Sequence, residues 1–367
     1  MNPIGMLSAE KNKRILVICP HPVDYVPGQR LKFEQYFDCW QGAGYQVDVS
    51  PFMSEKMQQI VYMEGHFLDK VGGTLGGYIC RVKDLFRVKK YDIVYVFLWV
   101  TPFGPPFFEY LLRKLASKIV YDIDDLIYMK RTSPANKFIK ILKSAGKVNF
   151  LMKNANHNLV STDKLMDYVR QFNKNISLIP ATVDIKKYPY PVGHKTSETV
   201  VIGWSGSHTT SKYLHLLDNV LKKIAEKYTI SIQVMGDKNF AIEGLPVELI
   251  EWTAATETQT LQQFDIGLHP LPDEEWIYGK SGGKLVQYMA AGLPIVASAL
   301  GPNCKAIKDG YNGFLADMDE EWIEKLSLLI EGKALRKQMG ANSRQFAEEY
   351  YSVEANSVKY LSVFNNL

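Results

Sequence analysis

Short apolar runs alternate with longer amphipathic stretches through the first half of this chain. The runs are four to six residues long, as buried strands are, and fall at 15–19, 46–51, 93–97, 119–123, 158–161 and 176–179. Strands separated by helical patterns are typical of a parallel sheet wound with helices. The first half therefore predicts an α/β domain. No Gly-x-Gly-x-x-Gly motif follows the first run, which disfavours a dinucleotide-binding domain there.

The same alternation restarts after a proline-punctuated stretch, Tyr188-Pro-Tyr-Pro-Val-Gly193, which predicts a hinge. Further strands are expected near 200–204, 230–235, 247–251, 266–268 and 294–298. This pattern predicts two Rossmann-like domains, 1–190 and 191–350, facing each other across a cleft. A last helix within 351–367 is expected to pack back on the first domain.

Composition fits a globular protein of two domains. The chain has 367 residues, of which 46% are hydrophobic and 22% are charged. Its four cysteines have no paired spacing, so neither a zinc site nor a disulfide framework is indicated, and a reducing cytoplasm is expected. The run at 15–19 is too short for a signal-peptide core or a membrane span.

Charge is distributed unevenly between the two halves. Residues 1–190 hold 27 Lys and Arg against 17 Asp and Glu, a net charge of +10, whereas the remainder holds 16 against 22, a net charge of −6. A basic domain suggests an anionic partner.

Two glycine-containing turns in the second half are candidates for binding phosphate. The segment 202–212 reads as a strand, a turn at Gly206, Ser207 and His208, and a helix start, where backbone N–H groups and the helix N-terminus favour a diphosphate. An ordinary strand-to-helix turn remains the alternative.

The second turn, Gly279-Lys-Ser-Gly-Gly-Lys284, is not a P-loop, because Glu274 stands where that motif needs glycine. Lys280 and Lys284 could neutralise the charge of a departing diphosphate, with Gly283 leaving room for it. Two solvated lysines on a loop are the alternative.

In order, these segments resemble the donor domain of glycosyltransferase family 4. The resemblance rests on 264–272, 279–298 and Gly310-Tyr-Asn-Gly-Phe-Leu315, and it extends over 200–352. It implies the GT-B fold, with two Rossmann-like domains, and transfer of a sugar from a nucleoside-diphosphate sugar with retention of configuration. It also implies that no metal or other cofactor is required.

The same resemblance implies a set of donor-binding residues. Gly206, Ser207 and His208 would approach the diphosphate, although Ser207 stands where the family usually has Arg. The family's two glutamates are replaced by Gly279 and Gln287, so Lys280, Lys284 and Gln287 would carry the donor contacts. Trp252 would lie near the base, and a core tryptophan is the alternative.

The first domain supplies candidates for the acceptor side. Asp124 and Asp125 follow a buried strand, where ligands collect in open α/β sheets, and could orient the acceptor hydroxyl or the donor sugar. Helix capping or a salt bridge to Arg131 is the alternative. Gly28 and Arg30, in the loop after the first strand, could grip an anionic acceptor. The acid cluster resembles the metal motif of the GT-A fold, but the donor signature lies in the other domain.

A basic amphipathic helix is predicted within 133–155. Lys140, Lys143 and Lys147 fall on one face and apolar residues on another, which suits an anionic membrane surface. A core-packed helix with solvated lysines is equally compatible. If the helix touches lipid, a lipid-linked acceptor follows; otherwise a glycan acceptor is expected, and no nucleic-acid module accompanies the charge.

The sequence thus predicts a cytoplasmic hexosyltransferase that acts in cell-surface polysaccharide or glycolipid synthesis and that is peripheral on the inner face of the membrane if the basic helix touches lipid. Because both family glutamates are absent, a non-catalytic GT-B protein that binds a nucleotide sugar or a partner remains the alternative.

Overall fold

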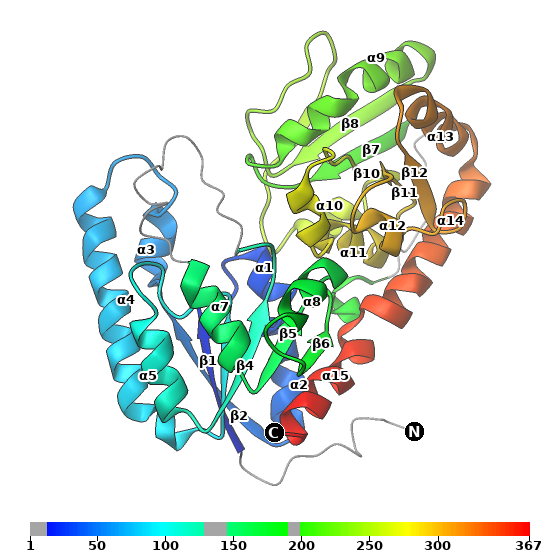
Figure 1. Cartoon of the computed structure of the whole chain (residues 1–367). Helices are drawn as coiled ribbons and strands as arrows, with labels where there is room; N and C mark the ends of the chain where they lie inside the picture. Colours follow the sequence, from blue (N-terminus) through cyan, green and yellow to red (C-terminus); the bar gives the residue numbers. More distant parts are fainter. Residues whose placement is uncertain (1–12, 128–144, 190–198) are drawn as a thin grey trace. The chain divides into compact units, whose positions relative to one another are not determined.

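The computed structural model describes residues 13–127, 145–189 and 199–367 (Figure 1). The chain forms two compact units. The first comprises Met1–Ala181, Gly279–Ser281 and Asn356–Leu367, and the second comprises Thr182–Tyr278 and Gly282–Ala355. Within the described residues, no helix combines the length and apolar character that a bilayer crossing requires.

The first unit is built on a six-stranded sheet with the order β2-β1-β3-β4-β5-β6, and every neighbouring pair is parallel. Its strands are β1 (Lys13–Cys19), β2 (Tyr45–Pro51), β3 (Ile93–Phe97), β4 (Lys118–Ile123), β5 (His157–Val160) and β6 (Ile176–Leu178). The central strands are buried on both faces, which explains their continuous apolar runs.

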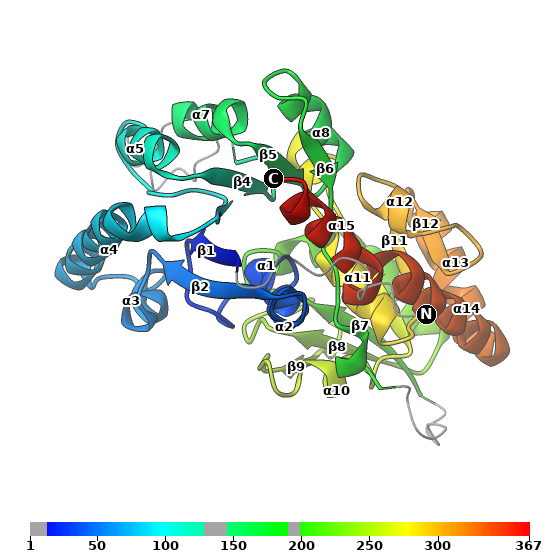
Figure 2. The ribbon, with the colours of Figure 1, turned by 90° about the horizontal axis from the view of Figure 1, so that it is seen from below.

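Helices cover both faces of this sheet. Helices α4 and α5 lie on one side, and α2 and the end of α15 lie on the other (Figure 2). The helices of this unit are α1 (Pro27–Arg30), α2 (Phe37–Gly42), α3 (Glu55–Ile60), α4 (Phe67–Arg87), α5 (Phe107–Leu115), α7 (Ala145–Asn154) and α8 (Asp163–Arg170), with 3-10 turns at Glu34–Tyr36 and Val88–Lys90. Side-chain oxygens of Ser54 and Thr162 cap α3 and α8.

The last helix, α15 (Val353–Asn365), passes from the second unit into the first along its length. In the first unit, Tyr360 and Phe364 join an aromatic cluster with Trp40 and Tyr95, at ring-centroid distances of 5.0–6.5 Å. The Tyr360 hydroxyl donates to the Lys32 carbonyl at 3.0 Å. The chain end is therefore part of the first unit's core.

The second unit repeats the plan with the strand order β12-β11-β10-β7-β8-β9, again parallel throughout. Its strands are β7 (Val200–Ser205), β8 (Ile230–Met235), β9 (Glu248–Ile250), β10 (Ile266–His269), β11 (Ile295–Ser298) and β12 (Gly313–Ala316). The helices are α9 (Asp218–Lys227), α10 (Glu257–Leu261), α11 (Gly283–Ala290), α12 (Asn303–Ala306), α13 (Asp319–Glu331) and α14 (Lys333–Phe346). Shorter turns are Ile185–Lys187, Ser211–Leu217, Glu275–Gly279 and the π-turn Ala347–Tyr351.

The predicted α/β architecture is confirmed, with two differences in the second unit. Strand β12 was not expected, because its four residues follow directly on a glycine turn. The segment after β7 is not the start of an α-helix: Ser211–Leu217 is a 3-10 helix, its N-cap residue Thr210 makes no capping hydrogen bond through its side chain, and α9 begins only at Asp218. The apolar side chains Leu214, Leu217, Leu221 and Ile224 are nevertheless all buried.

Candidate functional site

The strand order of the second unit points to one edge of its sheet. The connections after β7 run to β8 and β9 on one side, whereas β10, β11 and β12 lie on the other, so the order reverses between β7 and β10. In open α/β sheets, ligands bind at the carboxyl ends of the strands flanking such a switch point. Gly206 follows β7 there, and His269 ends β10.

Lys284 lies at this switch point. It is the second residue of α11, whose N-cap is Gly282 in the left-handed region at φ +73°. The Lys284 ammonium donates to Thr210 Oγ1 at 3.0 Å and lies 4.2 Å from the centroid of the Trp204 ring. A Cβ atom on Gly206 would overlap both Lys284 Nζ and the Trp204 ring. Glycine at 206 therefore lets a cation approach the end of β7.

The turn around Gly206 is held by its own backbone. Gly206 N donates to the Met235 carbonyl at 3.0 Å, and its own carbonyl lies so close to Gly236, at φ +99°, that a side chain there would overlap it. The hydroxyls of Ser207 and Thr209 are 2.8 Å apart. The turn that follows is a 3-10 helix, so the α-helix start that was expected to bind the diphosphate is not formed here. The positive group at this place is the Lys284 ammonium.

His208 follows β7 and Trp252 follows β9, with β8 between the two strands. Ser211 Oγ donates to Asp237 Oδ2 at 2.5 Å and lies 3.2 Å from the His208 carbonyl oxygen. Trp252 follows β9, and its Nε1 donates to Glu257 Oε1 at 2.7 Å. Trp252 is partly buried and packs against the core of the second unit, as the core-tryptophan alternative expects, and its place near a base stays a prediction.

Gln287 lies one turn after Lys284 on α11 and is 6% exposed. Its Nε2 donates to the hydroxyl of Tyr188 at 3.3 Å. Gly283, the first residue of the helix, is half-buried. The amide that stands in the family's glutamate position thus has a partner within the unit, and its contact with a donor ribose stays a prediction.

His269 is a residue that the sequence did not single out. Its Nδ1 lies 2.8 Å from Asn303 Oδ1. Burial and the nearby Lys284 charge lower the pKa of His269 to about 3, so the imidazole is neutral at physiological pH. The only signal in the sequence was its position at the end of the apolar run 266–268.

In the first unit, the strand order reverses between β1 and β3. Three non-glycine residues at the carboxyl ends of its strands adopt left-handed backbone conformations: Asp24 at φ 69°, Leu98 at φ 60° and Asp125 at φ 71°. They follow β1, β3 and β4. Such conformations cost of order 1–3 kcal/mol each and cluster at functional sites. This edge is the second candidate region.

A buried polar group shapes the loop after β1. Gln29, which is 1% exposed, accepts from His21 N and donates to the His21 carbonyl, both at 3.0 Å. It also donates to Glu34 Oε1 at 2.8 Å, and Glu34 Oε2 accepts from Asp24 N at 2.9 Å. Burial raises the pKa of Glu34. The sequence missed this pair.

The predicted acceptor-side residues Gly28 and Arg30 flank Gln29 in α1. Gly28 is exposed and Arg30 is half-buried. The Gln29–Glu34 pair therefore fixes the loop from which both project.

Asp124 and Asp125 have different surroundings. Asp124 Oδ1 is buried and has no hydrogen-bond partner among the described residues. Asp125 Oδ1 accepts from Leu126 N at 2.8 Å, and Asp125 Oδ2 lies 2.6 Å from Lys280 Nζ within the first unit. Lys280 is thereby brought to Asp125 rather than to Lys284. Arg131, the alternative partner, lies outside the described residues.

The prediction of a basic helix within 133–155 is wrong in the position of Lys147. Lys147 is not on an outer face: it is 3% exposed, donates to Thr101 Oγ1 and the Phe103 carbonyl, and lies 3.7 Å from Glu109 Oε1. Helix α7 packs against α5, so the face that carries Lys147 points inward. Residues 133–144, with Lys140 and Lys143, lie outside the described residues.

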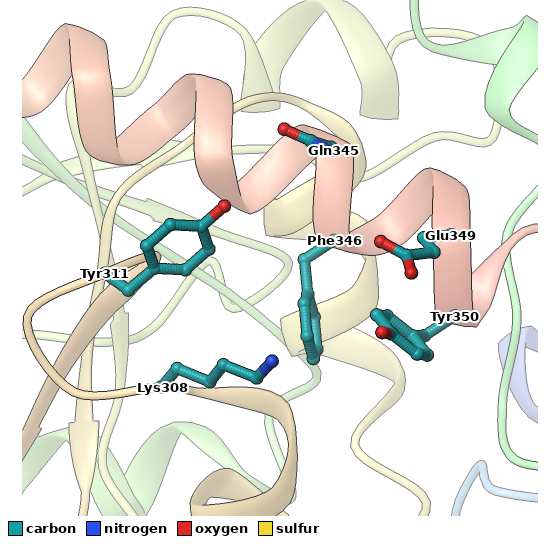
Figure 3. Close-up of a pocket in the computed structure, with 6 residues that line it drawn as sticks. All are labelled: Lys308, Tyr311, Gln345, Phe346, Glu349 and Tyr350. Carbon is teal, nitrogen blue, oxygen red and sulfur yellow. The ribbon is translucent and has the colours of Figure 1, made fainter.

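A hollow of about 260 Å³ in the second unit is lined by none of the residues predicted to bind the donor or the acceptor (Figure 3). The Lys308 ammonium lies over the Phe346 ring at 4.9 Å, and the hollow is lined by Lys308, Tyr311, Gln345, Phe346, Glu349 and Tyr350. Lys308 and Tyr311 precede β12, at the edge where the parallel strands begin. The hollow is therefore distinct from the switch point.

Part of the second unit is similar to known proteins. Residues 199–332 match the family model described as "Glycosyl transferases group 1". An uncharacterized glycosyltransferase of Methanocaldococcus jannaschii is 34% identical over 67 residues, which cover 18% of this chain and 19% of that protein. The curated relatives that the chain matches are covered over about a fifth to a quarter of their length.

Solved structures resemble the whole chain. Sucrose-phosphate synthase from Thermosynechococcus elongatus superimposes with a TM-score of 0.71 at 15% identity, covering 96% of this chain and 98% of that one. HepE of Anabaena, solved in complex with UDP-glucose, gives a TM-score of 0.62 at 14% identity, covering 98% and 100%. The chain has the GT-B fold, as predicted, and the comparisons support a glycosyltransferase family.

Proposed function

We propose that this protein transfers a sugar from a nucleoside-diphosphate sugar to an acceptor hydroxyl. One observation carries the proposal: the Lys284 ammonium sits at the β7–β10 switch point, in a turn that only glycine at 206 leaves open. A fixed cation at the carboxyl edge of a parallel sheet suits an anionic ligand. The segment around it, 199–332, is the part that matches the glycosyltransferase family model.

The proposed chemistry places Lys284 beside the diphosphate. As the bond between the sugar's anomeric carbon and the diphosphate oxygen breaks, negative charge builds on that oxygen, and a preorganised ammonium stabilises it. The neutral His269 leaves the Lys284 charge undiminished and can exchange a hydrogen bond but adds no second charge.

Retention of configuration follows if the acceptor hydroxyl attacks from the face that the diphosphate leaves. The acceptor oxygen then bonds to the anomeric carbon, and its proton passes to the departing diphosphate. In this scheme the protein mainly orients the reactants and stabilises charge. We assign the acceptor to the first unit, where the unpartnered Oδ1 of Asp124 can accept a hydrogen bond from a sugar or acceptor hydroxyl.

No metal ion is part of the proposal, because Lys284 supplies the positive charge that a metal supplies elsewhere. Within the described residues, no group of three His, Cys, Asp or Glu side chains is placed to hold one. We therefore expect that chelation with EDTA leaves donor turnover unchanged; a loss restored by added Mg²⁺ would contradict this.

One of the named neighbours bears on the donor. HepE was solved in complex with UDP-glucose. By analogy we propose a hexosyltransferase that uses such a donor and builds a cell-surface polysaccharide or glycolipid. All four cysteines are free thiols, which suits the reducing cytoplasm where we place this reaction.

A second candidate is a non-catalytic protein that binds a nucleotide sugar or a partner. It is favoured by Gln287, which replaces a carboxylate with an uncharged amide and directs that amide to Tyr188. Such a protein would hold the donor without activating it.

Two measurements separate these functions. Calorimetry with UDP, GDP and ADP tests binding, and release of nucleoside diphosphate from a panel of nucleotide sugars, with and without membrane extract as acceptor, tests transfer. Binding together with release supports the enzyme. Binding without release under every condition favours the second candidate, and absence of binding contradicts both.

A further inference from the structure

Helix α4 presents an apolar stripe to solvent. This stripe, which we call the α4 stripe, consists of Leu68, Val71, Leu75, Ile79, Val82 and Phe86. These are large aliphatic or aromatic side chains whose exposed fractions range from 41% for Val71 to 85% for Phe86. Residues 62–86 contribute nearly half of the exposed large apolar side chains in the part of the chain that the structure describes. A contiguous patch of this kind marks an interaction site.

The opposite face of α4 carries two glycines, Tyr78 and two buried charged residues, whereas a surface helix usually packs large aliphatic side chains against the core. Arg81 and Asp84 are each 1% exposed. The Arg81 guanidinium donates to the carbonyls of Val100 and Cys19 at 2.8 and 3.0 Å and to Asp84 Oδ2 at 2.9 Å. Asp84 also accepts from Ser50 Oγ at 2.7 Å. The helix is anchored to its sheet by charge, so its apolar side chains are not needed for that anchoring.

The spacing of the α4 stripe suits a flat surface. Successive members are three, four, four, three and four residues apart, which averages 3.6 residues per turn over the helix. A stripe at 3.6 residues runs straight along an α-helix, whereas a partner helix in a left-handed coiled coil requires 3.5. The stripe therefore fits a plane better than it fits a second copy of α4.

Positive charge accompanies the carboxyl-terminal half of the stripe. Lys83 is exposed on α4, and Lys89 and Lys90 are exposed in the turn that follows. Helix α5 packs against α4 and adds exposed Phe107, Tyr110 and Lys114. Of the two acidic residues of α4, Asp69 lies at its start and pairs with Lys56 at 3.7 Å, and Asp84 is buried.

We propose that the α4 stripe docks this protein on an anionic lipid surface. An amphipathic helix with Leu, Ile and Phe on one face and lysines beside it lies in the plane of the bilayer interface, where apolar burial and attraction to acidic headgroups add together. This surface is different from residues 133–155, and it carries part of the excess positive charge of the first half of the chain: residues 81–90 hold five Lys and Arg against one Asp. The docking requires no donor, so it stands independently of the proposed function.

Sedimentation of the full chain with lipid vesicles tests the docking. We expect binding to phosphatidylcholine vesicles that contain about one third phosphatidylglycerol, and weaker binding to phosphatidylcholine alone. The double variant Leu75→Glu/Ile79→Glu places charge on the stripe and should lower the bound fraction at least about tenfold. The variant Lys89→Glu/Lys90→Glu should weaken binding less and should reduce its salt dependence.

The matched control is Leu216→Glu/Leu328→Glu, which adds the same charge at two exposed leucines of the second unit. It should bind vesicles as the natural chain does. Circular dichroism confirms that each variant is folded, and none of the changed residues belongs to the candidate site, so donor turnover in solution should persist.

Three results would overturn the proposal. Absence of vesicle binding by the natural chain is the first, and equal binding by the stripe variant and the control is the second. The third is a concentration-dependent dimer in sedimentation velocity that Leu75→Glu/Ile79→Glu abolishes while vesicle binding is absent, because the stripe would then join two copies of the chain.

Discussion

The two units share a parallel fold but differ at their switch points. In the first unit, the carboxyl edge carries acids and left-handed non-glycine residues, among them Asp24 and Asp125. In the second, the edge carries glycine turns and one central cation, Lys284. The first edge is strained and offers an oxygen of Asp124 that has no hydrogen-bond partner within 13–127, 145–189 and 199–367, whereas the second edge is relaxed by glycine. This difference suits an edge that accepts hydrogen bonds and another that binds an anion.

In each half of the chain, the charge at the sheet edge is opposite in sign to the net charge of that half. The first half carries +10 and yet has an acidic edge, and the second carries −6 and yet has a lysine at its switch point. Part of the excess positive charge of the first half lies away from that edge, at the end of α4 and in the following turn, where residues 81–90 hold five Lys and Arg against one Asp. We therefore expect net charge to mark the unit that meets an anionic surface, and local charge to mark the unit that binds an anionic ligand.

The largest expected effect comes from removing the cation of the second edge. Lys284→Met should lower donor turnover about 100-fold or more, because one preorganised group that stabilises developing charge contributes a factor of that size. Nucleotide affinity, measured by calorimetry, should fall as well. Lys223→Met, on the exposed face of α9, is the control. If both variants kept full activity, the second edge would not bind the donor through charge.

A second prediction concerns Asp122, which lies beneath the first edge at the end of β4. Burial raises its pKa to about 6, against 3.8 ordinarily. Between about pH 4 and 6, the folded protein therefore keeps the proton on Asp122, whereas the unfolded chain has released it. The free energy of unfolding consequently falls as pH rises through this range. Two pKa units correspond to about 3 kcal/mol.

Urea unfolding across this pH range measures the slope. Asp122→Asn should flatten it, because the titrating group is gone. Tyr95→Phe removes a hydrogen bond that favours the ionised carboxylate, so the window should extend to higher pH. A slope that is the same in all three proteins would assign the pH dependence to other groups.

Asp124 should matter for transfer rather than for donor binding. Asp124→Asn removes the charge of a carboxylate with a buried, unpartnered oxygen, and we expect transfer to the acceptor to fall by about tenfold or more with unchanged UDP affinity. Asp167→Asn, which changes an exposed carboxylate on α8, is the control. A loss of UDP affinity equal to the loss of transfer would place Asp124 on the donor side instead.

The sequence predicted most of the fold, because strands buried on both faces leave continuous apolar runs. It missed β12, which is short and enters from a turn. The contacts of Lys284 with Thr210 and Trp204 could not be predicted. The 3-10 helix at Ser211–Leu217 and, in the first unit, the left-handed backbone of Leu98 leave no mark in the residue pattern. Lys147 shows a further limit, since helical periodicity groups side chains on a face without showing which way that face points.

Lys280 provides the smallest and sharpest test of the comparison between the edges. Sequence reasoning gave Lys280 and Lys284 the same role, but Lys280 pairs with Asp125 at 2.6 Å, and both side chains are 41% exposed. An ion pair this exposed contributes at most about 1 kcal/mol to stability, and the charge it neutralises is no longer available to a diphosphate. Lys280→Met should therefore change donor turnover by no more than about threefold.

Asp125→Asn frees the lysine charge and should leave turnover unchanged or slightly higher. If Lys280→Met proved as damaging as Lys284→Met in the same donor-release assay, the cation of the first unit would also act on the donor, and the assignment of one anion-binding edge to the second unit would fail.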